Sequence, residues 1–353
     1  MPKEKLSYEH IISSPEISNK EKNQELKDVL EEKDKGLAKF ELKKTPDDIK
    51  TIEQTDSIVN NIIKGYGCDS KKIPLDHIYI LKPGSVATIT GNELSEGIHR
   101  PIGINIGVEK KESKFLFAAT IAHELFHAKS PKTIRIEKTP TGEHEIHLYR
   151  SGIEMVGKKD EDKKPGKEKA YFTILEEAIV AECTKKFLNE ISKVGPYRED
   201  AKAVEKLKNW LIDYRKEQGV SDENLRFIKD ELRYIDNPQE RVKKIMKFYD
   251  DKESRQAYAA GMITRLIKEK EIEIVERYKE RKMLYNLLDK IVEKSNGQFK
   301  NREAIFSEFA KANFTGNYLS IAPIVENALG KGSFRELANK FGTERKNKNN
   351  NTD

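Results

Sequence analysis

Residues 115–128 read Phe-Leu-Phe-Ala-Ala-Thr-Ile-Ala-His-Glu-Leu-Phe-His-Ala, an almost uncharged stretch in a 353-residue chain of which 36% is charged. The stretch predicts a helix that is apolar nearly all round, which is typical of a helix buried in a core. It contains His123 and His127, which lie one turn apart on the same face of such a helix. We therefore expect the chain to fold around a helix that presents two imidazoles side by side.

This histidine pair, with Glu124 directly after its first member, is the pattern in which two imidazoles bind one Zn²⁺ and the glutamate acts as a base. Ionisable side chains in a buried helix are costly unless a partner satisfies them, and a metal ion would be such a partner. The competing interpretation is a pair of core histidines hydrogen-bonded to the backbone. The chain would then be a helical interaction protein in which the pentapeptide is accidental.

The composition limits the classes of partner. The chain has 66 basic and 60 acidic residues, and its mean hydropathy is −0.75. Charges of both signs are densely mixed and form no basic stripe, so we do not expect nucleic-acid binding. The two cysteines, Cys68 and Cys183, are too few for a disulfide scaffold. No segment resembles a signal peptide or a membrane span, so we expect a cytoplasmic protein without membrane contact.

The pattern along the chain predicts an α+β fold. Short strands are expected at residues 78–81 and 102–108, and two more around Ser151-Gly152, at 143–149 and 153–156. We predict a small sheet whose edge strand packs on the buried histidine-bearing helix, followed by a mostly α-helical C-terminal region. The expected divisions are a charged N-terminal arm that is helical or partly disordered (1–52), a domain with the histidine pair (53–194), a helical domain (195–345) and a disordered tail (346–353).

A catalytic zinc site needs a third protein ligand beside the two histidines. His144 and His147 lie on opposite faces of a predicted strand, so at most one of them could reach the metal. Glu176 and Glu177 belong to a predicted helix at 172–190, and both enter its apolar side. Glu182 lies with lysines on what we interpret as the solvated side of that helix. Helical geometry alone does not choose between Glu176 and Glu177.

The residues from His123 to His127, with Glu176-Glu177-Ala178 downstream, resemble the gluzincin zinc metallopeptidases over about residues 55–190. Matched position by position, the resemblance makes Glu177 the third ligand of a single Zn²⁺, together with both histidines, and makes residues 53–194 a catalytic domain. In the thermolysin-like branch an aspartate four residues after this ligand orients the first histidine. Ala181 stands there in this chain, so the resemblance implies that another group orients His123.

The resemblance implies zinc-dependent peptide-bond hydrolysis, with Glu124 activating the zinc-bound water. An unrestricted protease would be hazardous in the cytoplasm, so we expect a restricted protein substrate, cut by endopeptidase action. In the strand predicted at residues 102–108, apolar residues alternate with residues of little apolar bulk, so one face is nearly bare. This pattern favours an extended peptide pairing with the strand. The alternative function is a catalytically weak, gluzincin-like zinc protein with a regulatory or binding role. The sequence does not indicate an oligomeric state. Candidates for stabilising an oxyanion are Tyr149, Arg150, Tyr171, Tyr197, His144 and His147.

Overall fold

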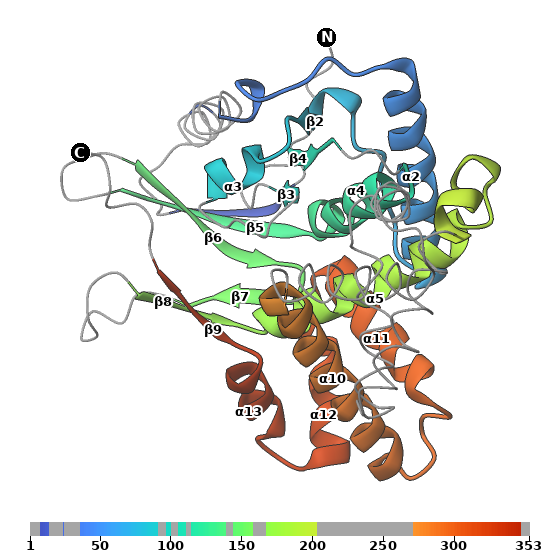
Figure 1. Cartoon of the computed structure of the whole chain (residues 1–353). Helices are drawn as coiled ribbons and strands as arrows, with labels where there is room; N and C mark the ends of the chain where they lie inside the picture. The colour runs from blue at the N-terminus through green and yellow to red at the C-terminus, as the bar shows by residue number, and fades with distance from the viewer. Residues whose placement is uncertain are drawn as a thin grey trace.

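The computed structural model describes residues 8–13, 24, 36–90, 97–99, 105–110, 114–138, 144–157, 167–202 and 271–346. Within these residues the chain has two sheets and several helices, with a helical C-terminal region, so the predicted α+β class is confirmed (Figure 1). None of the helices in the described part of the chain is long and apolar enough to cross a membrane.

The smaller sheet has three strands in the order β2 (Ile78–Leu81), β4 (Ile106–Glu109) and β3 (Gly97–His99). Strand β2 is parallel to β4, and β3 is antiparallel to it. The strand predicted at 102–108 therefore corresponds to β4 in its described part. Among the described strands β3 is an edge strand, with β4 on one side only.

Strand β4 has a neighbour on each side, so the prediction that a substrate pairs with this strand is wrong for residues 106–109. The missing side chain of Gly107 in this strand has another structural reason. A Cβ atom on Gly107 would lie 2.7 Å from the side chain of Leu81 and 3.0 Å from that of Leu37. The missing side chain makes room for these leucines and not for a substrate backbone.

The larger sheet has six strands, and both chain-terminal strands lie at its edges (Figure 1). Strand β1 pairs with β5 in parallel, and every other pair is antiparallel. The strands predicted on either side of Ser151-Gly152 are confirmed as β6 and β7. The order is β1 (Tyr8–Ser13), β5 (Lys132–Lys138), β6 (His144–Ser151), β7 (Glu154–Val156), β8 (Lys167–Tyr171) and β9 (Thr343–Lys346).

Apart from residues 85–90, the described helices surround a large apolar core, while Val86 packs in a smaller cluster with Leu37 and Leu81. The helix predicted at 172–190 is confirmed as α5, whereas the helices predicted between 203 and 250 lie outside the described residues. The helices are α2 (Pro46–Gly65), α3 (Ser85–Thr90), α4 (Lys114–Lys129), α5 (Thr173–Ile191), α10 (Glu271–Lys294), α11 (Arg302–Thr315), α12 (Ala322–Leu329) and α13 (Ser333–Lys340).

Helix α4 is the centre of this core. Every residue from Phe115 to Ala128 is buried, as the apolar stretch predicts. Helices α2 and α5 contact α4, and α5 in turn contacts α10 of the C-terminal region (Figure 1). Side chains from α4, α5 and α11, such as Phe126, Phe187 and Phe309, belong to the same hydrophobic cluster. The division of the chain at residues 194–195 into two domains stays a prediction.

The C-terminal region also fixes the start of α5. Phe172, which precedes the helix, has a left-handed backbone with φ 61°. Its buried ring packs against that of Phe334, with ring centroids 5.2 Å apart. The Ile174 amide donates to the Phe341 carbonyl at 3.0 Å. Bulky residues adopt a left-handed conformation only where the surroundings enforce it. The first turn of α5 is therefore held in place by residues that follow it by more than 160 positions.

A buried asparagine connects α11 to the end of α4. The Asn313 side chain accepts from the Ile153 amide at 3.1 Å and donates to the Ser130 hydroxyl at 3.2 Å. Gly152, in the turn between β6 and β7, has φ +55° and lies against the Asn313 side-chain oxygen. A side chain at this position would displace the amide that joins the two helices.

We expect Gly152→Ala to destabilise the fold by about 2–5 kcal/mol, because a left-handed alanine costs about 1–2 kcal/mol and overpacking adds about 1–3. Gly297→Ala is the matched control, since Gly297 also has positive φ, at +80°, but open space around it. Urea denaturation of both variants measures the difference, which is the contribution of the contact with Asn313. Equal losses in the two variants would contradict this account of Gly152.

Candidate metal centre

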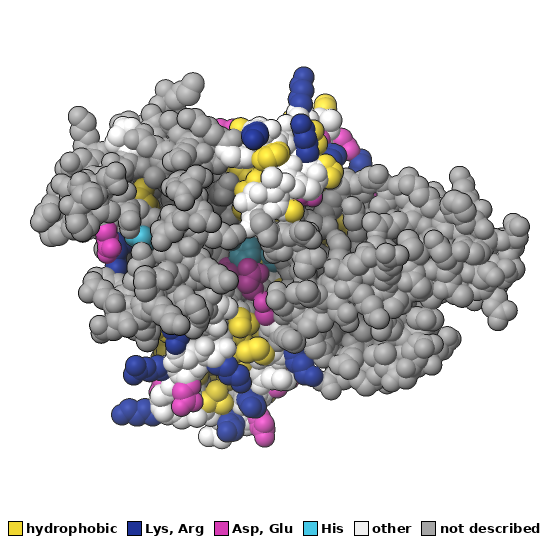
Figure 2. Space-filling view, turned by 60° about the vertical axis from the view of Figure 1, so that its left-hand side comes forward, with side chains coloured by type: hydrophobic (Ala, Val, Ile, Leu, Met, Phe, Trp, Pro, Cys, Tyr) yellow, Lys and Arg dark blue, Asp and Glu magenta, His cyan; other side chains and the backbone are white. Residues whose placement is uncertain are grey.

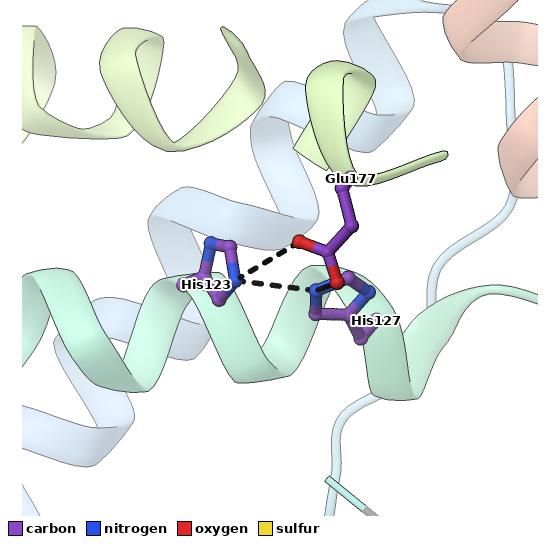
Figure 3. Close-up of side chains that lie close together, drawn as sticks. All are labelled: His123, His127 and Glu177. Atoms are coloured by element: carbon purple, nitrogen blue, oxygen red, sulfur yellow. Dashed lines mark hydrogen bonds and ion pairs between the residues drawn. The ribbon is translucent and has the colours of Figure 1, made fainter. Parts of the chain in front are cut away.

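Three potential ligand groups converge between α4 and α5 (Figure 3). The Nε2 atoms of His123 and His127 are 3.2 Å apart. The Glu177 carboxylate lies 3.5 Å from Nε2 of His127 and 3.8 Å from Nε2 of His123. Both histidines are buried, while the Glu177 side chain is 36% exposed. Figure 2 shows histidine and acidic side chains gathered near the centre of one face of the molecule.

These separations fit a common metal ion. Two ligands at about 2.0–2.1 Å from a tetrahedral ion lie about 3.3 Å from each other. The two Nε2 atoms, 3.2 Å apart, are close to this value, and a Glu177 oxygen lies 3.5 Å from one of them while the other oxygen lies 3.8 Å from the second. A set of two imidazoles and one carboxylate that leaves one coordination position open is the donor set of catalytic zinc sites. The His123, His127 and Glu177 group could therefore hold a metal ion.

The opposite nitrogen of each imidazole also has a partner. Nδ1 of His127 lies 2.9 Å from Oε1 of buried Glu176, and Nδ1 of His123 lies 3.5 Å from the Thr184 hydroxyl. That hydroxyl donates to the Val180 carbonyl at 2.8 Å, so its oxygen is available as an acceptor. Acceptors at both Nδ1 atoms favour a ring proton at each of them, so that an Nε2 lone pair of each ring can bind a metal once His127 has lost its second ring proton.

The two glutamates that the sequence left as alternatives have different positions. Glu177 lies in the ligand group, and Glu176 contacts the far nitrogen of His127. Thr184 takes the position of the group that orients His123, which the sequence analysis did not identify. Thr184 follows Glu177 by seven residues, which is two turns along the same face of α5. This spacing in the sequence could have indicated that Thr184 lies on the side of the helix that faces the histidines.

The Glu124 carboxylate lies against strand β3. A Cβ on Gly97 would be 2.5 Å from its Oε1, and Nδ1 of His99 is 3.6 Å from its Oε2. The His99 ring also stacks on His127, with centroids 4.6 Å apart and planes 11° from parallel. No sequence motif indicates His99, because it reaches α4 through the pairing of its strand with β4.

A fully buried lysine lies near the group. Burial lowers the pKa of Lys132 to about 8, and the charge of Glu176 opposes that change. Glu154 is also buried and accepts a hydrogen bond from the Thr173 hydroxyl at 2.8 Å. The sequence analysis did not identify these residues either. Lys132 supplies a positive charge to the buried environment of Glu176, and this attraction offsets part of the cost of burying that carboxylate.

The two stacked histidines have opposite shifts of pKa. Burial lowers the pKa of His127, but the charges of Glu176 and Glu177 outweigh burial and leave this pKa well above its ordinary value. Burial also lowers the pKa of His99, and the charges of His127 and Lys132 lower it further. In the metal-free protein His127 is therefore the imidazole that carries a second ring proton and a positive charge, whereas His99 is neutral with one ring proton.

The interpretation of Glu182 as a solvated surface charge is wrong. Its side chain is 13% exposed, lies 3.3 Å from the Arg281 guanidinium and accepts from the Tyr285 hydroxyl. Both partners come from α10, which covers this side of α5. A helix about one hundred residues away in the sequence thus buries a face that local periodicity assigned to solvent.

Several predicted candidates lie elsewhere. His147 is not in the ligand group of the described residues, and the His144 side chain lies outside the described part of the structure. Of the suggested oxyanion partners, Arg150 is buried and donates to the Gly316 carbonyl and the Thr133 hydroxyl. The others contact neighbouring side chains: Tyr149 with Arg135, Tyr171 with Lys169, and Tyr197 with Gln54.

Comparison of the chain with protein-family models, with curated proteins and with solved structures gives no match. An assignment of function therefore depends on the geometry around His123, His127 and Glu177.

Metal analysis of three variants separates the roles of the glutamates. Glu177→Ala should abolish stoichiometric zinc, because it removes a ligand. Glu176→Gln should keep one zinc per chain but weaken binding roughly 10–100-fold, since it disturbs only the partner of His127. Glu190→Gln, an exposed change on the same helix, is the control and should bind as the parent does. Full zinc affinity in Glu177→Ala would refute the ligand assignment.

Zinc affinity should fall with falling pH. Because the pKa of His127 is raised, its imidazole carries a second ring proton in the metal-free protein. This proton must leave before Nε2 can bind a metal. Below that pKa each unit of pH should weaken the apparent affinity about tenfold. Titration calorimetry in buffers of different ionisation enthalpy measures both the affinity and the protons released. An affinity independent of pH, with no proton release, would contradict this ordering.

Proposed function

We propose that this protein is a gluzincin-like zinc peptidase in which His123, His127 and Glu177 hold the ion and Glu124 is the general base. The observation that carries the proposal is the convergence of two Nε2 atoms from α4 and a carboxylate from α5 within 3.2–3.8 Å. The acceptors at both Nδ1 atoms support it, because they direct the Nε2 lone pairs into the group.

The proposal of zinc rests on the donor set and on the spacing of His123 and His127 with a glutamate after the first. Two histidines and one carboxylate also bind Fe²⁺ in facial octahedral sites. The metal content of the purified protein distinguishes the two ions.

In this proposal His123, His127 and Glu177 would hold a Zn²⁺ ion, which would supply Lewis-acid chemistry toward a peptide carbonyl and a water whose pKa is lowered to about 7. The Glu124 carboxylate accepts a proton from the attacking water and later passes it to the leaving nitrogen. A base placed in this way contributes roughly 10²–10⁴-fold to the rate. Glu176 and Thr184 keep the two imidazoles oriented throughout, because each contacts the nitrogen that faces away from the ligand group.

The geometry of β3 favours an extended peptide as the substrate. In the described sheet β3 has β4 on one side only, so its other edge is available for β-augmentation. A peptide on that edge would lie beside Gly97 and His99, which face Glu124. Strand addition requires neither end of the peptide, which favours endopeptidase action. With the cytoplasmic location that the sequence predicts, we propose a restricted protein substrate.

Glu124→Gln should keep one zinc per chain and lower peptide hydrolysis roughly 10²–10⁴-fold, because the amide cannot accept the proton. Zinc content and turnover of a quenched peptide library measure the two effects. Glu137→Gln, an exposed change on β5, is the control. Parent-level hydrolysis by Glu124→Gln would overturn the mechanism. A parent protein that binds zinc but cleaves no peptide would instead identify the weakly catalytic binding protein.

A further inference from the structure

Two residues of strand β3 lie against the histidine-bearing helix. Gly97 and His99 are two residues apart, so they face the same side of the strand. Both lie next to Glu124, as the 2.5 Å distance from a Cβ on Gly97 and the 3.6 Å distance from His99 establish. Ile98 faces the other way and packs with Leu81 and Val86. One face of a three-residue strand therefore contacts both oxygens of the proposed base.

His99 is the one residue of β3 that contacts both the base and a ligand of the proposed site. Its ring stacks on that of His127 with centroids 4.6 Å apart, and its Nδ1 faces Oε2 of Glu124. The stacking fixes the plane of the His99 ring and thereby the direction in which Nδ1 points. Its side chain is 22% exposed, which places it at the border between the core and the surface.

Glutamate has three side-chain torsions, so a catalytic glutamate needs contacts that select one orientation. Gly97 offers only space, whereas the His99 imidazole offers a donor at Nδ1. The separation of 3.6 Å exceeds a hydrogen bond, and catalytic contacts that are long in ligand-free sites shorten in the reacting complex.

We propose that His99 is a positioning residue for Glu124, which it holds from the edge strand by donating from Nδ1 to the carboxylate. The effect on catalysis rests on the proposed peptidase function, while the contact itself does not. The structure places this donor where a substrate pairing with β3 would pass, so the same strand would bind the substrate and orient the base.

Two substitutions separate the donor from the ring. His99→Phe keeps an aromatic ring that can stack on His127 but has no N–H, whereas His99→Asn places an amide N–H near the position of Nδ1. We expect His99→Phe to lower kcat roughly 10–100-fold with unchanged KM and zinc content, and His99→Asn to recover kcat to within about fivefold of the parent. His77→Asn is the control, since this histidine contacts Asn105 and not the site.

Crystal structures of the zinc-loaded parent and both variants give a readout that does not need turnover. We expect the Glu124 carboxylate to have the same orientation in the parent and in His99→Asn. In His99→Phe we expect it to adopt a different orientation. The proposal would be overturned by an unchanged orientation of Glu124 in His99→Phe or by equal losses of kcat in the two variants. It would also be overturned if His99→Phe lost zinc content while its kcat stayed unchanged. If the parent cleaves no peptide, the peptidase function fails while the structures still decide the role of His99.

Discussion

The contact between His127 and Glu176 is the interaction on which the rest of the site depends. It joins α4 to α5 inside the core, where a charge without a partner is expensive. The carboxylate orients the imidazole, and the imidazole gives the buried carboxylate a donor. Lys132 adds a positive charge to the same environment. Two apolar helices can therefore pack with ionisable groups between them, and Glu177 then lies beside both imidazoles at a partly exposed position.

The sequence predicts the parts of this arrangement that local periodicity determines. The apolar stretch at 115–128 gives α4 and its burial, and the spacing of His123 and His127 gives one shared face. It does not distinguish Glu176 from Glu177, because both enter the core and the rotation of α5 about its axis is set by tertiary packing. The burial of Glu182 likewise depends on tertiary packing, because α10 covers a helix face that periodicity alone predicts to be exposed.

Residues contributed by strands were harder to find. His99 and Lys132 reach the site through sheet pairing, and strand alternation does not reveal what a strand faces. The bare positions in the strand at 102–108 predicted pairing with an extended peptide, whereas the residues that lie against Gly107 are Leu37 and Leu81 of the core. A bare strand face indicates that something approaches closely, but the identity of the neighbour depends on sheet order.

The left-handed Phe172 has a consequence for the order of events in the cell. The first turn of α5, which carries Glu176 and Glu177, is held by the carbonyls of Ala338 and Phe341 and by the ring of Phe334. During translation these residues leave the ribosome long after the two histidines. A nascent chain that ends before Ser333 has the imidazole pair but lacks the frame for its carboxylates. In the proposed metal site, Glu177 would therefore take its place as a ligand only after residues 333–341 have been synthesised.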